Sequence, residues 1–167
     1  MEKDQSHLRL LPAVDPNTKS EGSVQHTLFP MTASSWTVAF VQLSTSQERS
    51  LIELLDWIRP RWVIDLRPLP RFDYGTLSRR RVFEHLDRLA AVYHDVFATL
   101  GFQTRSQAHT HIDVIAQTVA EVVGQPGAAM GPIVVLVDEP PSPEETTTVP
   151  RRLSEKSPGK KWDVLVA

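Results

Sequence analysis

The stretch WVIDLRPLPRF, residues 62–72, decides the fold. Its first residues are apolar, aromatic or β-branched, which is typical of a strand covered on both faces. The apolar run stops at Asp65, Arg67 follows two residues later, and Pro68 and Pro70 then prevent the strand from continuing. In an open α/β sheet, ligands bind in the crevice beyond the carboxyl ends of the strands. The stretch therefore predicts a buried strand and, directly after it, the place where a binding site would lie.

Segments with strand character alternate with amphipathic segments on both sides of this stretch. Residues 91–96 fit either an extension of a helix or a short strand, and Val92, Tyr93 and Val96 favour the strand. We expect the remaining strands at residues 36–43, 61–66, 132–137 and 162–166. One helix should end near residue 59, and two others should span residues 79–90 and 110–123. Residues 97–107 should form a connection, and the proline-rich polar segment at 141–159 has room for a short helix. This alternation predicts a doubly wound, three-layer α/β domain with a mostly parallel sheet of about five strands.

The first 35 residues differ from the rest of the chain. They contain several Pro, Ser and Thr residues and show no sustained hydrophobic period. Such a segment buries too little apolar surface to offset the entropy that ordering would cost. The sequence therefore predicts a flexible arm at residues 1–35 and an α/β domain at residues 36–167.

Composition excludes some classes of chemistry. The chain has 167 residues, a net charge of -2 and no cysteine. Disulfides, thiolate catalysis and zinc–thiolate sites are thereby excluded, and the molecule as a whole is not a basic nucleic-acid binder, although a local basic patch stays open. The chain begins with polar residues, and no segment approaches the roughly 20 apolar residues that a membrane helix needs. We expect a cytoplasmic protein.

Acidic residues follow several of the predicted strands. Asp65, Asp95, Asp138 and Glu139 are expected at the same edge of a parallel sheet. Convergent carboxylates of this kind could hold Mg²⁺ or Mn²⁺ for phosphoester chemistry, which makes Asp65 and Asp138 the candidate catalytic residues. In the alternative interpretation, Asp65 pairs with Arg67 and the other acidic side chains are solvated. No metal ligand is assigned on this pattern alone.

Arginines are concentrated around the second strand and the helix after it. Their guanidinium groups match the geometry of phosphate oxygens, and a phosphate, nucleotide or nucleic-acid contact is one interpretation. The candidate ligand-binding residues are Asp65, Arg67, Arg71 and Arg79. The alternative is a solvated basic face that pairs with nearby acidic residues, and the sequence leaves both open.

The predicted arm contains the sequence QHTLF at residues 25–29. Gln25, Leu28 and Phe29 match the short peptide by which bacterial replication and repair proteins bind the DNA sliding clamp, and a histidine stands where that peptide usually has leucine. The two apolar side chains would enter a pocket while the glutamine forms hydrogen bonds. In the alternative interpretation, this segment packs on a sheet edge of the domain.

Residues 57–101 contain an ordered set of motifs: VIDLR at 63–67, PRF at 70–72, Tyr93-His94 and Leu100-Gly101. This set resembles the bacterial family known as domain of unknown function four-eight-eight, and a weaker likeness extends over residues 131–140. The resemblance implies a Rossmann-like fold. Typical members carry cysteines just after the strand that corresponds to Ile133–Val137, where this chain has Asp138 and no cysteine anywhere. An activity of that cysteine cluster is therefore not expected here.

Two classes of function follow. The first is a non-catalytic bacterial accessory protein that binds an anionic ligand or nucleic acid at the Arg-rich strand end and docks a partner through Gln25, Leu28 and Phe29, without a cofactor. The alternative is a metal-dependent phosphoesterase or nucleotide-processing enzyme that uses Asp65 and Asp138, with Mg²⁺ or Mn²⁺. The chain has no Gly-rich phosphate-binding fingerprint and no Ser-His-Asp order, and the first class is therefore favoured.

Overall fold

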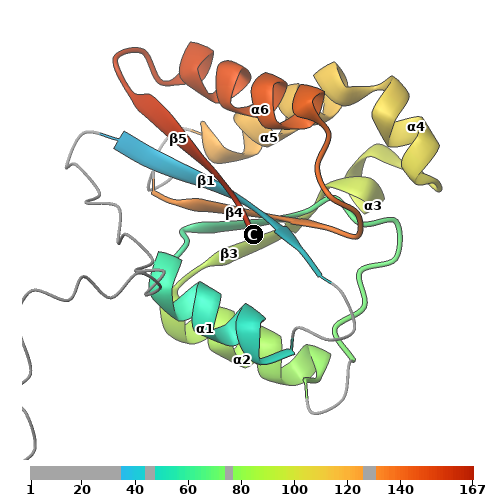
Figure 1. Ribbon diagram of the computed structural model, residues 1–167, viewed down its shortest axis with the longest axis vertical. Helices are drawn as coiled ribbons and strands as arrows, with labels where there is room; N and C mark the ends of the chain where they lie inside the picture. Colours follow the sequence, from blue (N-terminus) through green and yellow to red (C-terminus); the bar gives the residue numbers. More distant parts are fainter. Residues whose placement is uncertain (1–34, 44–47, 74–76, 126–130) are drawn as a thin grey trace, which may run out of the picture. The chain divides into compact units, whose positions relative to one another are not determined.

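The structure, a computed structural model, describes residues 35–43, 48–73, 77–125 and 131–167 (Figure 1). The arm predicted at residues 1–35, with Gln25, Leu28 and Phe29, lies outside the described residues except for Ser35, which begins the first strand. In the described part of the chain, no helix combines the length and the apolar character needed to cross a membrane.

The described strands form one sheet in which every neighbouring pair is parallel. The sheet has five strands in the order β3-β2-β4-β1-β5. Their bounds are β1 Ser35–Gln42, β2 Trp62–Asp65, β3 Val92–Asp95, β4 Ile133–Val137 and β5 Lys161–Val166. The predicted α/β class is confirmed, and the sheet is entirely parallel in these residues.

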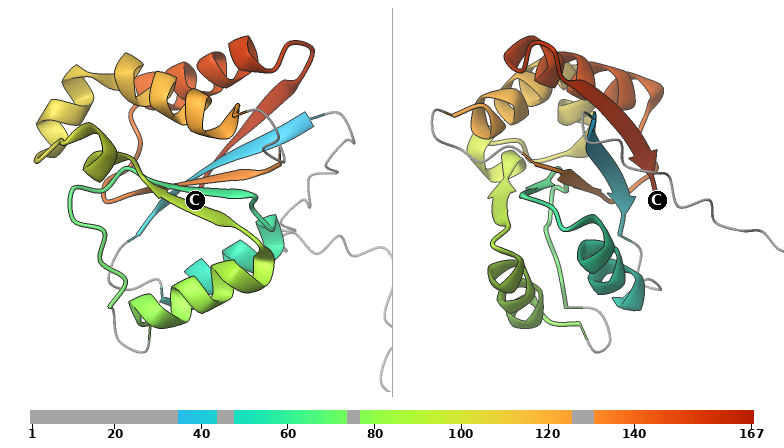
Figure 2. Two further views of the ribbon diagram at one scale, coloured as in Figure 1. Left: turned by 180° about the vertical axis from the view of Figure 1, so that it is seen from behind. Right: turned by 90° about the vertical axis from the view of Figure 1, so that its left-hand side faces the viewer.

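Helices cover both faces of the sheet, which makes the fold a three-layer, Rossmann-like sandwich (Figure 2). One face is covered by α1 and α2, which pack on a core that includes Val63 and Leu136. The opposite face carries a core that includes Ile64 and Val135, which face α5 and α6. The helices are α1 Glu48–Ile58, α2 Arg79–Leu89, α3 Val96–Leu100, α4 Arg105–Thr110, α5 Ile112–Val123 and α6 Pro143–Lys156.

Consecutive residues of a strand point to opposite faces, and this explains the apolar run of the opening stretch. Val63 packs in the core of the α1–α2 face, whereas Trp62 and Ile64 pack in the core of the other face. All four residues of β2 are buried. A central parallel strand has no solvated face, and its sequence is therefore apolar up to the residue at which it ends.

The strand order places a topological switch point at the ends of β2 and β4. These strands are neighbours, and the chain leaves β2 toward α2 on one face but leaves β4 toward α6 on the other. Such a reversal of direction opens a gap beyond the carboxyl ends of the two strands. The residues that follow β2 and β4 therefore lie at the end of the sheet where a binding site is expected in this kind of fold.

The structure corrects one prediction of local structure and confirms another. Residues 97–107 were expected to form a connection between two elements. Instead, α3 spans Val96–Leu100 and α4 begins at Arg105. Both helices are short, and capping residues stabilise their first turns. Asp95 is the N-cap of α3, and Thr104 and Gln107 form a capping box on α4. The predicted strand at 91–96 is confirmed for residues 92–95, but the last residue of that range begins α3.

The helix in the proline-rich segment at residues 141–159 is longer than the short helix expected there. It forms α6, a helix of 14 residues. Ser142 and Glu145 form a capping box, and Pro143 occupies the first turn, where its missing N–H costs nothing. Pro150 lies inside the helix, and both it and Val149 are buried against the core. Tertiary packing therefore outweighs the low helix propensity of this proline.

Candidate functional site

A fully buried ion pair lies directly after β2. The side chains of Asp65 and Arg67 each have an exposed fraction of 0%. The guanidinium group donates two parallel hydrogen bonds, from Nε to Oδ1 at 2.8 Å and from Nη2 to Oδ2 at 2.7 Å. The backbone N–H of Arg67 also donates to Oδ1 at 3.0 Å. This bidentate geometry is the strongest form of side-chain ion pair, and it fixes both side chains.

Tyr93, on the neighbouring strand β3, completes the surroundings of the Asp65 carboxylate. Its hydroxyl donates to Oδ2 at 2.9 Å. Burial raises the pKa of Tyr93 well above its usual range, and the adjacent charge of Asp65 raises it further. The phenol therefore remains a hydrogen-bond donor at any physiological pH. With this contact, the two oxygens of Asp65 accept four hydrogen bonds.

Arg67 also shapes the loop that follows it. Its Nη1 donates to the backbone carbonyl of Arg71 at 2.9 Å. Its guanidinium carbon lies 4.6 Å from the centre of the Phe72 ring, which has an exposed fraction of only 1%. The loop is thus held from inside by one arginine, and Arg71 stands on this fixed backbone with its own side chain exposed.

A second ion pair ties the same loop to the opposite face of the sheet. Arg105, at the start of α4, donates to Glu145 Oε1 at 2.6 Å and to the carbonyl of Leu66 at 3.3 Å. The other oxygen of Glu145 accepts from the backbone N–H of Ser142 at 2.8 Å. Glu145 has an exposed side-chain fraction of 2%. This pair joins the loop after β2 to the starts of α4 and α6.

Asp138 directly follows β4, and its side chain is exposed. Partial burial raises its pKa, the positive charge of Arg67 lowers it, and the negative charge of Asp65 raises it again, with a net upward shift. These influences place the carboxyl within electrostatic reach of the buried pair. Its carboxylate form is therefore less well accommodated in the folded protein than in the unfolded chain.

The structure brings some of the predicted site residues together. Arg79, at the start of α2, places its guanidinium over the ring of Phe83 at 5.0 Å, and that ring packs against Phe72 at 5.9 Å. Arg71 and Arg79 therefore belong to one corner of the molecule, at the end of β2. Asp95 does not contribute to it, because its carboxylate accepts the backbone N–H of Ala98 at 2.9 Å and caps α3.

Three functional side chains were missed at the level of sequence. Glu145 follows Ser142 by three residues, which is the spacing of a capping box, and this spacing could have predicted the position of Glu145 at a helix start. Tyr93 was predicted to be a strand residue but not a partner of Asp65. The register pairs it with Val63, two residues before Asp65, and its hydroxyl reaches the carboxylate from there. Nothing in the local sequence of Arg105 indicates that its side chain reaches across to Leu66.

The geometry weakens the metal-dependent alternative. Asp65 uses its oxygens for four protein hydrogen bonds, and Arg67 neutralises its charge at close range. Within the described ranges there is no group of three or more His, Asp or Glu side chains arranged to hold a metal ion. Asp65 is therefore a poor ligand for a shared ion, and Asp138 has no carboxylate partner of that kind on β2.

We predict that Asp65→Asn lowers the free energy of unfolding by about 3–5 kcal/mol, because it leaves the buried guanidinium of Arg67 without a counter-charge. Urea unfolding followed by circular dichroism measures the change. The matched control is Glu84→Gln in the exposed pair with Arg80, where the N–O distance is also 2.7 Å. That control should cost no more than about 0.5 kcal/mol. Equal losses in the two variants would contradict a structural role for the buried pair.

Asp138→Asn should act in the opposite direction. Its folded pKa is raised, and the ionised carboxylate therefore opposes folding at neutral pH, an effect that disappears below the pKa of the unfolded chain. We expect the variant to unfold at a higher urea concentration than the parent at pH 7, and the difference to vanish as the pH falls to about 3. A variant that is less stable than the parent at pH 7 would show that the carboxylate is needed by the fold.

Comparison with known proteins found no relative: no family model, no curated protein and no solved structure matches this chain. The likeness of residues 57–101 to the family described above therefore stays a resemblance, and the candidate site depends on its own geometry.

Proposed function

We propose that the protein is a non-catalytic, cytoplasmic accessory protein of bacterial type that binds an anionic ligand, most simply nucleic acid, at the corner formed by the loop after β2 and the start of α2. One observation carries this proposal. Two exposed arginines lie here: the carbonyl of Arg71 is held by the buried Arg67 side chain, and Arg79 begins α2 with its backbone N–H bonded to Asp73. A preorganised basic corner loses little entropy when it binds phosphate groups.

The corner separates positioning residues from contact residues. Asp65 and Arg67 are buried completely and hold the loop, so they act as positioning residues. Arg71 and Arg79 have exposed side chains and would contact the anion directly. The backbone N–H of Arg79 donates to Asp73 Oδ1 at 3.1 Å, which ties the start of α2 to the end of the loop.

The charge pattern of α2 supports a functional explanation. Its first turn begins with three arginines and contains no acidic residue. Cations at a helix N-terminus oppose the helix dipole, a local cost of about 0.3–1 kcal/mol each at exposed positions. Arg80 offsets this cost through its pair with Glu84, whereas Arg79 forms no ion pair within the described residues and would gain from a phosphate group.

The second part of the proposal concerns the partner. Gln25, Leu28 and Phe29 lie outside the described residues, and their match to the clamp-binding peptide is the only support. We include the DNA sliding clamp as the partner because a protein with a nucleic-acid corner and a clamp-binding peptide would act at one place on DNA. The enzyme alternative is not retained, since Asp65 is occupied by Arg67 and Tyr93.

Nucleic-acid binding is tested with the full chain and a fluorescently labelled single-stranded DNA oligonucleotide, by anisotropy at several salt concentrations. Arg71→Gln combined with Arg79→Gln should weaken binding about tenfold, and should reduce the slope of log Kd against log salt by about one to two. Arg80→Gln is the control, because its side chain is already paired with Glu84. If the parent does not bind at low salt, or if the control weakens binding equally, the proposal fails.

Partner docking is tested by surface plasmon resonance with a purified bacterial sliding clamp. Leu28→Ala combined with Phe29→Ala should abolish binding and leave the urea midpoint unchanged, because two apolar anchors are lost from a peptide that folds on its partner. The control is Leu10→Ala combined with Leu11→Ala, which removes a second apolar pair upstream. A lowered urea midpoint in the test variant would instead show that these residues pack on the domain.

A further inference from the structure

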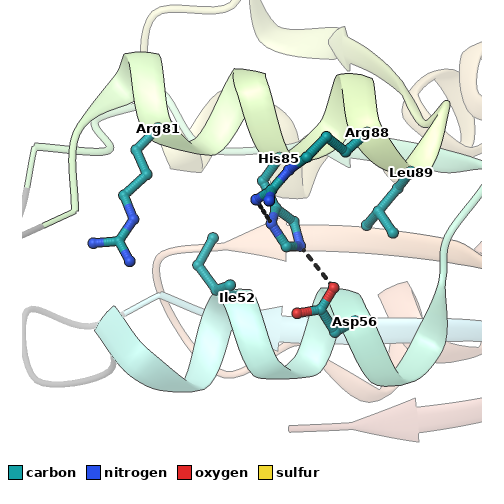
Figure 3. Close-up of a pocket in the computed structure, with 6 residues that line it drawn as sticks. All are labelled: Ile52, Asp56, Arg81, His85, Arg88 and Leu89. Atoms are coloured by element: carbon teal, nitrogen blue, oxygen red, sulfur yellow. Dashed lines mark hydrogen bonds and ion pairs between the residues drawn. The ribbon is translucent and has the colours of Figure 1, made fainter.

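A pocket separate from the corner lies between α1 and α2, which run side by side on one face of the sheet (Figure 3). Its volume is ≈ 270 Å³. It is lined by Ile52 and Asp56 of α1 and by Arg81, His85, Arg88 and Leu89 of α2. The three basic residues are four and three positions apart, which places them on a single face of the helix.

His85 is the least exposed of these side chains, at 5%. Its Nδ1 lies 2.7 Å from Nη2 of Arg88. A guanidinium group only donates hydrogen bonds, and Nδ1 must therefore be the acceptor. The ring proton of the neutral imidazole consequently sits on Nε2.

The Nε2–H group of His85 is buried and faces the carboxylate of Asp56. Nε2 lies 3.0 Å from Oδ1 of Asp56, but the contact is not aligned as a hydrogen bond, and Nε2 has no aligned acceptor among the described residues. Buried polar groups are nearly always satisfied, and an exception that lines a pocket points to a ligand. An acceptor atom in the pocket would satisfy it.

The charges around the pocket favour an anion. Arg81 extends from α2 toward α1, and Arg88 folds back along α2 to the ring of His85 (Figure 3). Asp56 is the one acidic side chain of the lining, and it lies beside the Nε2 atom of His85 (Figure 3). No described side chain forms an ion pair with Arg81, while its backbone N–H is held by Ser78 Oγ at 3.2 Å. Two positive charges against one negative charge leave a net positive site.

We propose that this pocket binds a phosphate group, with Arg81 and Arg88 supplying charge and forked donors and His85 Nε2–H supplying a third, directed donor. A tetrahedral oxyanion offers enough acceptors for all three. The apolar walls formed by Ile52 and Leu89 reduce competition from water. The volume lies at or below the usual range of about 300–1,000 Å³ for whole small-molecule ligands, so the pocket takes the phosphate and leaves the rest of the ligand outside.

This site goes beyond the nucleic-acid corner. Arg79 contacts the ring of Phe83, whereas Arg81 lies two residues further on, about 200° around the helix. The phosphate could belong to a small phosphorylated compound or to a nucleic-acid backbone, which share this chemistry. Either source needs the same three donors.

The test is isothermal titration calorimetry of the full chain with pyrophosphate at fixed ionic strength. Arg81→Gln should weaken binding at least about tenfold, because one charge-assisted contact is lost. Arg80→Gln should stay within about twofold: it makes the same charge change one residue away, on a side chain that is 88% exposed and paired with Glu84. Addition of pyrophosphate should also move the ¹⁵N signal of His85 Nε2, a response that a remote surface site cannot produce.

Two results would overturn the proposal. One is the absence of saturable pyrophosphate binding by the parent protein. The other is an equal loss of affinity in Arg81→Gln and Arg80→Gln, with no shift of the His85 signal. Competition then identifies the source of the phosphate: displacement of pyrophosphate by a single-stranded oligonucleotide indicates a nucleic-acid backbone, and binding that the oligonucleotide does not displace indicates a small phosphorylated compound. The Arg71 and Arg79 variants leave pyrophosphate affinity unchanged, so the failure of either site is recognised separately.

Discussion

The buried pair of Asp65 and Arg67 is the interaction on which the candidate site depends. Removing two charges from water is costly, and the cost is offset only where geometry is good and the remaining donors and acceptors are used. Here the bidentate contact, the Tyr93 hydroxyl and a backbone N–H serve the carboxylate, while the Arg71 carbonyl serves the guanidinium. The same contacts define the path of the loop. The contacts that stabilise the ion pair therefore also determine the conformation of the loop after β2.

The topology of the sheet explains why this pair occurs where it does. The ends of β2 and β4 are neighbours, and the chain leaves these two strands toward opposite faces of the sheet. The pair of Arg105 and Glu145 joins the β2 loop to helices on the opposite face of the sheet. Two ion pairs, one within the β2 end and its loop and one between α4 and α6, thus hold the backbone at this end of the sheet.

Helix α2 presents three different faces, and each has its own role. Val82 and Leu86 pack into the core beneath the helix. The guanidinium of Arg79 lies over the ring of Phe83, and this face belongs to the corner for which nucleic-acid binding is proposed. The third face carries His85 between two arginines and lines the pocket beside α1. A run of arginines that looks uniform along the chain is thus divided by helical geometry into separate environments.

The sequence by itself determined the parallel α/β class, most of the strands, and the position of Asp65 and Arg67 at a strand end, because hydrophobic period and proline placement are local properties. It also indicated that these two residues could pair, since they are two positions apart. Only the tertiary structure decided their partners. Tyr93 is 28 positions from Asp65, and Arg105 is 40 positions from Glu145. Contacts over such separations depend on strand order and on which face each helix covers, and a single sequence carries no local signal for either. For the same reason, the pocket around His85 became visible only when α1 and α2 were placed side by side.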